Sequence, residues 1–281
     1  YQSLAGASGA DCTAFGYQTL KTSTGINNTA FGSGAGDVIV AGADNTAVGK
    51  DSLGANISGN DNVAVGKGAG LALLTSQNTA VGSESLVAAS GADCTAVGFQ
   101  ALNVSTGINN TALGSGAGVL ISSGTDNVAI GKGSLAAVTT QNYNTAIGSG
   151  AGAAIAASNC SVFGYQSLAG ASGADCTAFG YQALKNSTGI NNTAFGSGTG
   201  DAITASQFNT ALGAGALGGA LTSVNNGNNV AVGYEAGKVL TGGDNVAIGS
   251  RAMDLATTSS GNVAVGRLAL SLAVAGADNN V

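Results

Sequence analysis

Carboxylates are the residues of this chain whose spacing comes closest to catalytic or metal-binding chemistry. Seven of them stand immediately before copies of a recurring five-residue motif, namely Asp11, Asp44, Asp61, Asp93, Asp126, Asp175 and Asp244. Ca²⁺ can bind between such turn carboxylates, but Asp is also an ordinary turn residue that hydrogen-bonds its own backbone. We favour the turn interpretation, because the slot is not filled in consecutive repeats throughout, and keep Ca²⁺ as the one candidate cofactor. A glycosidase needs two carboxylates across a cleft, which a column along an edge does not provide.

Nucleophilic catalysis has little support in this sequence. The chain contains no histidine, so the usual Ser/His and Cys/His pairs are excluded. Its cysteines, Cys12, Cys94, Cys160 and Cys176, all take the first position of the motif, without the C-x-x-C spacing of a metal site. We interpret them as small residues in a partly buried column. Cys160 and Cys176 lie in adjacent repeats and form the candidate disulfide. The sequence therefore predicts a protein that is not an enzyme.

The composition of the chain argues against several kinds of binding partner. The formal net charge is −6, and charged residues make up only 8% of the chain, against about 25% in ordinary soluble domains. An acidic chain lacks the basic face that nucleic acid requires. Its longest uncharged stretch is rich in Gly, Ser and Asn, which argues against membrane insertion. An apolar content of 44% also argues against disorder.

The motif itself reads Asn/Cys–Thr/Val–Ala–hydrophobic–Gly and recurs sixteen times. Its copies begin at residues 12, 28, 45, 62, 78, 94, 110, 127, 144, 160, 176, 192, 209, 229, 245 and 262. The steps are 16 or 17 residues, apart from one of 20. A fixed short period indicates stacked supersecondary units. The sequence therefore predicts an all-β parallel β-solenoid of about seventeen coils, each coil being one motif and its linker.

Alternation within the motif predicts which side chains share a face. We number the motif residues 1 to 5 and continue the count through the coil. Strands are expected at positions 1–4 and 6–9, with a bend at the glycine of position 5. Positions 2 and 4 share one face, and we expect this face to be interior, because position 4 is always large and apolar. The alanine of position 3 would then face outward, against a closely packed neighbouring chain.

Three columns are expected to act as structural ladders. Stacked Asn side chains at position 1 can hydrogen-bond along the stack. The predicted ladder residues are Asn28, Asn45, Asn62 and Asn78 at position 1, Ala14, Ala30 and Ala47 at position 3, and Gly16, Gly32 and Gly49 at position 5.

The sequence also repeats with a second period that is longer than one coil. Residues 1–37 and 165–201 differ at three positions. These segments are separated by twice the basic offset, which is 82 residues, or five coils. We predict one repetitive solenoid over residues 1–281, with super-repeats at approximately 1–82, 83–164 and 165–246 and a partial copy at 247–281. Because both ends cut through a coil, we expect the chain to be a fragment of a longer protein.

Several copies of the motif resemble known fibrous proteins. Asn-Thr-Ala-Val-Gly at Asn45 and Asn-Val-Ala-Ile-Gly at Asn127 resemble the head repeats of YadA-like trimeric autotransporter adhesins. The run Cys-Thr-Ala-Phe-Gly-Tyr-Gln-Ala-Leu from Cys176 is similar to repeats of phage and large-virus tail-fibre proteins. The resemblance covers essentially the whole chain. It implies a left-handed β-roll, a side-by-side homotrimer and adhesion to host surfaces.

The sequence thus favours a non-enzymatic fibrous surface protein, a rigid rod for attachment to a host or surface. Its expected location is extracellular, on a cell or virion surface, and its expected partners are copies of itself and a host receptor or glycan. A homopolymeric filament stacked end to end is the alternative. An ice-binding solenoid is a weaker one, because the threonines of position 2 are expected to lie inside. Tyr17, Tyr165, Tyr181 and Tyr234, at position 6, are outward-facing candidates for ligand contact.

Overall fold

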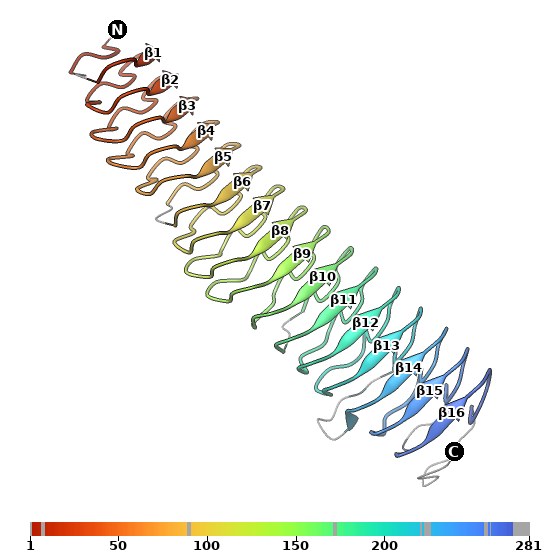
Figure 1. Cartoon of the computed structure of the whole chain (residues 1–281). Helices are drawn as coiled ribbons and strands as arrows, with labels where there is room; N and C mark the ends of the chain where they lie inside the picture. The colour runs from red at the N-terminus through yellow and green to blue at the C-terminus, as the bar shows by residue number, and fades with distance from the viewer. Residues whose placement is uncertain are drawn as a thin grey trace. The chain divides into compact units, whose positions relative to one another are not determined.

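The fold is a parallel β-solenoid, seen in a computed structural model of the chain (Figure 1). The structure describes residues 2–6, 9–88, 91–170, 173–219, 221, 226–255, 258 and 260–271. Asn280 and Val281, which match the first two positions of a further copy of the motif, lie outside these residues, as does part of the longer linker at 222–228 that produces the one step of 20 residues. The chain forms two compact units, Tyr1–Tyr143 and Asn144–Val281, each described by itself below. Within the described residues there is no α-helix, and none of them forms a helix suited to crossing a membrane.

Each motif contributes one three-residue strand, made by positions 2 to 4. The first unit contains β1 (Thr13–Phe15), β2 (Thr29–Phe31), β3 (Thr46–Val48), β4 (Val63–Val65), β5 (Thr79–Val81), β6 (Thr95–Val97), β7 (Thr111–Leu113) and β8 (Val128–Ile130). The second contains β9 (Thr145–Ile147), β10 (Ser161–Phe163), β11 (Thr177–Phe179), β12 (Thr193–Phe195), β13 (Thr210–Leu212), β14 (Val230–Val232), β15 (Val246–Ile248) and β16 (Val263–Val265). In each unit, successive strands pair in parallel with motif positions in register, as Ala30 with Ala47.

The prediction of a second strand at positions 6–9 is wrong, because this segment is a run of turns. The reason is backbone conformation, because positions 7 and 9 adopt positive φ, as at Gln18 (52°) and Leu20 (46°). Alternating left-handed residues cannot form an extended strand. Backbone hydrogen bonds still connect neighbouring coils here, as from Gly34 N to Tyr17 O at 2.9 Å.

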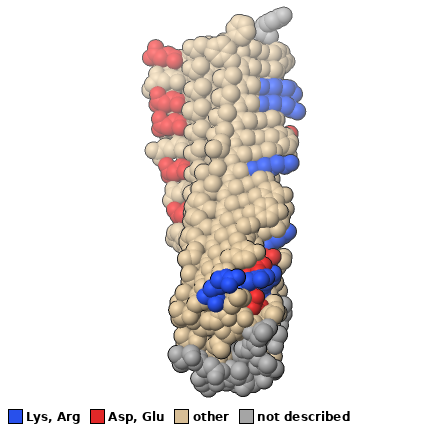
Figure 2. Space-filling view, turned by 90° about the vertical axis from the view of Figure 1, so that its right-hand side faces the viewer, with Lys and Arg blue, Asp and Glu red and all other residues tan. Residues whose placement is uncertain are grey.

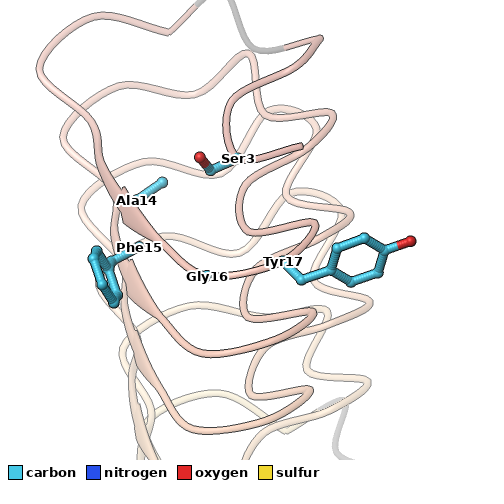
Figure 3. Close-up of a pocket in the computed structure, with 5 residues that line it drawn as sticks. All are labelled: Ser3, Ala14, Phe15, Gly16 and Tyr17. Atoms are coloured by element: carbon cyan, nitrogen blue, oxygen red, sulfur yellow. The ribbon is translucent and has the colours of Figure 1, made fainter. Parts of the chain in front are cut away.

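The strand faces are the reverse of those expected from the sequence. The alanine of position 3 is fully buried, as at Ala30, Ala47 and Ala64, whereas the residues on either side of it point outward. Phe31 and Val48 at position 4 are 43% and 37% exposed. Figure 3 shows Ala14 directed into the coil and Phe15 away from it. The alanine column is therefore core, and it is not the surface against which another chain packs.

The interior is filled from the opposite wall, by positions 9 and 12. In most coils a large residue at one of these positions accompanies a small residue at the other. Leu20, Leu53 and Leu102 at position 9 occur with Ser23, Asn56 and Ser105 at position 12, whereas Gly36, Gly70 and Gly118 occur with Ile39, Leu73 and Ile121. A Cβ atom on Gly36 would lie 2.7 Å from Leu20 Cδ2 and 2.9 Å from Ile39 Cδ1. Because these large side chains take most of the available volume, position 3 contributes a small residue, which is alanine in every strand except β10, where it is Val162.

Candidate functional site

Outside the core, the molecule offers two surfaces with distinct chemistry. The outer sheet face is formed by the side chains of positions 2 and 4. The turn edge is formed by positions 6, 7 and 10, which follow the glycine bend. In Figure 3, Phe15 and Tyr17 mark these two surfaces at the first coil.

The outer sheet face combines threonine and apolar side chains that are exposed or half-buried, and it carries no charged residue among the strand residues. Position 4 provides a continuous row of Phe, Val, Leu and Ile side chains in each unit. In the second unit three of these rings stack, with centroids 4.2 Å apart for Phe163 and Phe179 and 4.7 Å apart for Phe179 and Phe195. The threonines of position 2 lie beside this row and are partly exposed. Sequence reasoning missed this surface by assigning position 4 to the interior.

The turn edge carries the tyrosines that the sequence singled out. Tyr17, Tyr165, Tyr181 and Tyr234 are all about half exposed, as expected for outward-facing residues. The rings of Tyr165 and Tyr181 stack at 5.6 Å, and Gln182 Nε2 donates to Gln166 Oε1 at 3.0 Å beside them. The lysines also lie on this edge, and Figure 2 shows basic side chains on the side of the coils opposite an acidic column.

The acidic column is built from the turn residue before the motif, which is Asp in seven coils. Asp44 and Asp126 both have a φ of 57–58°, a left-handed conformation that Asn, Asp and Gly tolerate best. Asn27 Nδ2 donates to Asp44 Oδ1, and Asn109 Nδ2 donates to Asp126 Oδ1, each at 2.9 Å. Together with a bond from Thr125, the Asn109 bond lowers the pKa of Asp126. Turn geometry therefore accounts for this slot. Among the described residues, no three acidic, His or Cys side chains gather as a metal site.

Position 1 forms a buried chain of hydrogen bonds. Asn45 donates from both its backbone N and its Nδ2 to Asn28 Oδ1, at 3.0 and 3.1 Å. Asn62 binds Asn45 Oδ1 in the same way, and Asn78 binds Asn62 Oδ1. Each Nδ2 also reaches a linker carbonyl, as from Asn45 to Gly59 O at 2.8 Å. These side chains are fully or almost fully buried, so the ladder has a structural role.

All four cysteines are free thiols in the structure. Cys94, Cys160 and Cys176 are buried, and Cys94 Sγ donates to Gly107 O at 3.3 Å, where an Asn would place its Nδ2. Burial raises the pKa of the Cys94 thiol. A hydrogen bond with the Cys160 thiol, and then burial, raise the pKa of Cys176. The thiols of Cys94 and Cys176 are therefore poor nucleophiles at neutral pH.

Two hollows open on the first unit. One, of about 660 Å³, is lined by Ser3, Ala14, Phe15, Gly16 and Tyr17 (Figure 3). It is bounded by the edge of β1 that pairs with no strand among the described residues, so we assign it no ligand. The other, of about 370 Å³, lies on the turn edge between Asp51 and Glu84.

Comparison of the chain with protein-family models and with curated proteins finds no match. The geometry of the chain therefore carries the functional argument.

Proposed function

We propose that this chain is the rod segment of a non-enzymatic fibrous surface protein, whose copies pack side by side through the outer sheet face. The observation that carries the proposal is the continuous row of apolar side chains at position 4, each of them exposed or half-buried. Extended exposed apolar patches on soluble proteins commonly mark interaction sites. Two properties of this face favour a second copy of the chain as the partner. The face carries no charge, and its side chains repeat with the period of the coils.

A homotrimer of left-handed coils is the arrangement implied by the resemblance to adhesin heads and tail fibres. In our proposal the outer sheet faces of three chains close around a common axis and bury position 4. The turn edges and the acidic columns stay outside, available for attachment to a host receptor or glycan. An extracellular location on a cell or virion surface follows from this role.

Assembly can be tested with charges placed on one surface at a time. The double variant Val81→Glu and Phe179→Glu places a carboxylate on the outer sheet face of each unit. We expect it to be monomeric at micromolar concentration while the unchanged chain is trimeric, because each axial level would bury three like charges without partners. Light scattering combined with small-angle X-ray scattering measures both states.

The matched control carries the same charges in the same coils but on the turn edge, as Ser83→Glu and Tyr181→Glu. It should assemble like the unchanged chain. A monomeric unchanged chain would contradict the trimer. Trimers of equal mass for all three proteins would instead contradict the outer sheet face as the interface. A mass that grows continuously with concentration would instead favour a filament stacked end to end.

The outer sheet face also supports a second candidate, an ice-binding solenoid. The sequence argument against it placed the threonines of position 2 inside, but Thr29, Thr46 and Thr79 point outward beside the apolar row. A flat, regular array of hydroxyl and methyl groups is suited to ordering water. We nevertheless expect no inhibition of ice recrystallisation by the assembled protein, because assembly covers this array. Inhibition at micromolar concentration, lost in Val81→Glu and Phe179→Glu, would favour ice binding.

A further inference from the structure

The hollow between Asp51 and Glu84 arises from a missing side chain. Position 7 is Asp51, Gly68 and Glu84 in three consecutive coils. A Cβ atom on Gly68 would meet nothing within 4 Å. Because neighbouring strands lie about 4.8 Å apart, the backbones of the two acidic residues are separated by about 9.6 Å across this gap. We call this hollow the Gly68 notch.

Hydrogen bonds hold the polar wall of the notch in place. Gln100 Nε2 donates to Glu84 Oε2 at 2.9 Å, and Asn103 Nδ2 donates to the backbone oxygen of Glu84 at 2.8 Å. Glu84, Gln100 and Asn103 are all half-buried. The notch therefore presents a carboxylate and two amide groups in fixed positions.

The charges around the notch balance. Asp51 forms an ion pair with Lys50, with an Nζ–Oδ2 distance of 3.3 Å, and Lys67 lines the hollow together with Glu84. Two carboxylates and two ammonium groups give no net charge. The notch is thus poorly suited to selecting an ion, yet it offers both strong acceptors and strong donors.

The notch also has an apolar part. Leu71 and Val87, at position 10 of two adjacent coils, line it beside the polar groups. A ligand that matches both parts must be neutral and carry many hydroxyl groups as well as a C–H surface. A pyranose ring has these properties, and its size suits a volume of about 370 Å³.

We propose that the Gly68 notch binds one ring of a neutral carbohydrate. The hydroxyl groups donate to the carboxylates of Asp51 and Glu84 and accept from Lys67 and the amides, while a C–H face lies against Leu71 and Val87. The role of the notch in attachment to a host rests on the proposed function. Sugar binding by the notch does not depend on assembly, because the notch lies within one chain and on the turn edge rather than on the outer sheet face.

The test fills the notch with a residue that the fold already accepts. Position 7 holds Gln in four other coils, at Gln18, Gln100, Gln166 and Gln182, with φ between 49° and 54°, so Gly68→Gln is compatible with the backbone. We expect saturation-transfer signals from D-glucose, D-galactose, D-mannose or N-acetyl-D-glucosamine with the unchanged chain. In Gly68→Gln the signal of the binding sugar should fall at least fivefold.

Gly116→Gln is the matched control, because a Cβ atom there also meets nothing within 4 Å, while its neighbours at position 7 are Gln100 and Gly133 rather than two carboxylates. It should keep the signal. The inference is overturned if no sugar gives a signal, if Gly68→Gln binds normally, or if both variants lose binding. Light scattering of the same samples separates this result from assembly, because a trimer without sugar binding contradicts only the notch.

Discussion

Replacing Gly49 by alanine is expected to lower the free energy of unfolding by more than about 3 kcal/mol. Gly49 occupies the bend at position 5 with φ +128°, a conformation that L side chains rarely adopt. A Cβ atom there would lie 2.6 Å from Gly66 O and 2.7 Å from Gly66 C. Both atoms belong to the backbone of the next coil, so relief requires the stacked coils to separate.

Gly116→Ala is the appropriate control for this prediction. Gly116 also has a positive φ, +66°, but its Cβ atom would face open space. This variant should lose only about 1 kcal/mol, the ordinary cost of placing alanine in a left-handed conformation. Urea denaturation followed by circular dichroism measures both values. Equal losses for the two variants would show that backbone strain matters here and close stacking does not.

The solenoid could be predicted from the sequence because the period of the motif is independent of which face is buried. Alternation established that positions 2 and 4 share a face, but not whether that face is interior. Phe31 and Ala30 illustrate the difficulty, since a large apolar residue normally indicates the core. The signal that would have decided between the two faces is the inverse size of positions 9 and 12 in most coils, as in Leu20 with Ser23 and Gly36 with Ile39. Such compensation occurs only where two positions share one interior space.

The turns and the notch were less accessible to sequence reasoning, for a different reason. Buried leucines with positive φ, such as Leu20 and Leu53, contradict the usual preference of that residue, so positions 6–9 resembled a strand. The coil-to-coil contacts override the local preference. The Gly68 notch depends on neighbours 16 or 17 residues away, Asp51 and Glu84. It becomes visible only when the coils are aligned in register.

Replacing Asn62 by leucine should produce the second large effect, a loss of about 3 to 5 kcal/mol in the free energy of unfolding. Asn62 Nδ2 donates to Asn45 Oδ1 at 3.0 Å and to Thr75 O at 2.9 Å. Its Oδ1 accepts from the backbone N and the Nδ2 of Asn78. Leucine has a similar volume but leaves these buried groups without their partners in two neighbouring coils.

Asn62→Cys tests whether lost hydrogen bonds are the cause. The fold already accepts cysteine at this position, and Cys94 Sγ donates to Gly107 O as an Asn amide would, but a thiol has no Oδ1 for the next coil. We therefore expect a loss of about half that of Asn62→Leu, measured by the same urea titration. If the cysteine variant is as unstable as the leucine variant, only the Oδ1 hydrogen bonds between coils contribute to the free energy of unfolding. If both variants are as stable as the unchanged chain, the Asn ladder does not hold the coils together, and packing of positions 3, 9 and 12 must suffice.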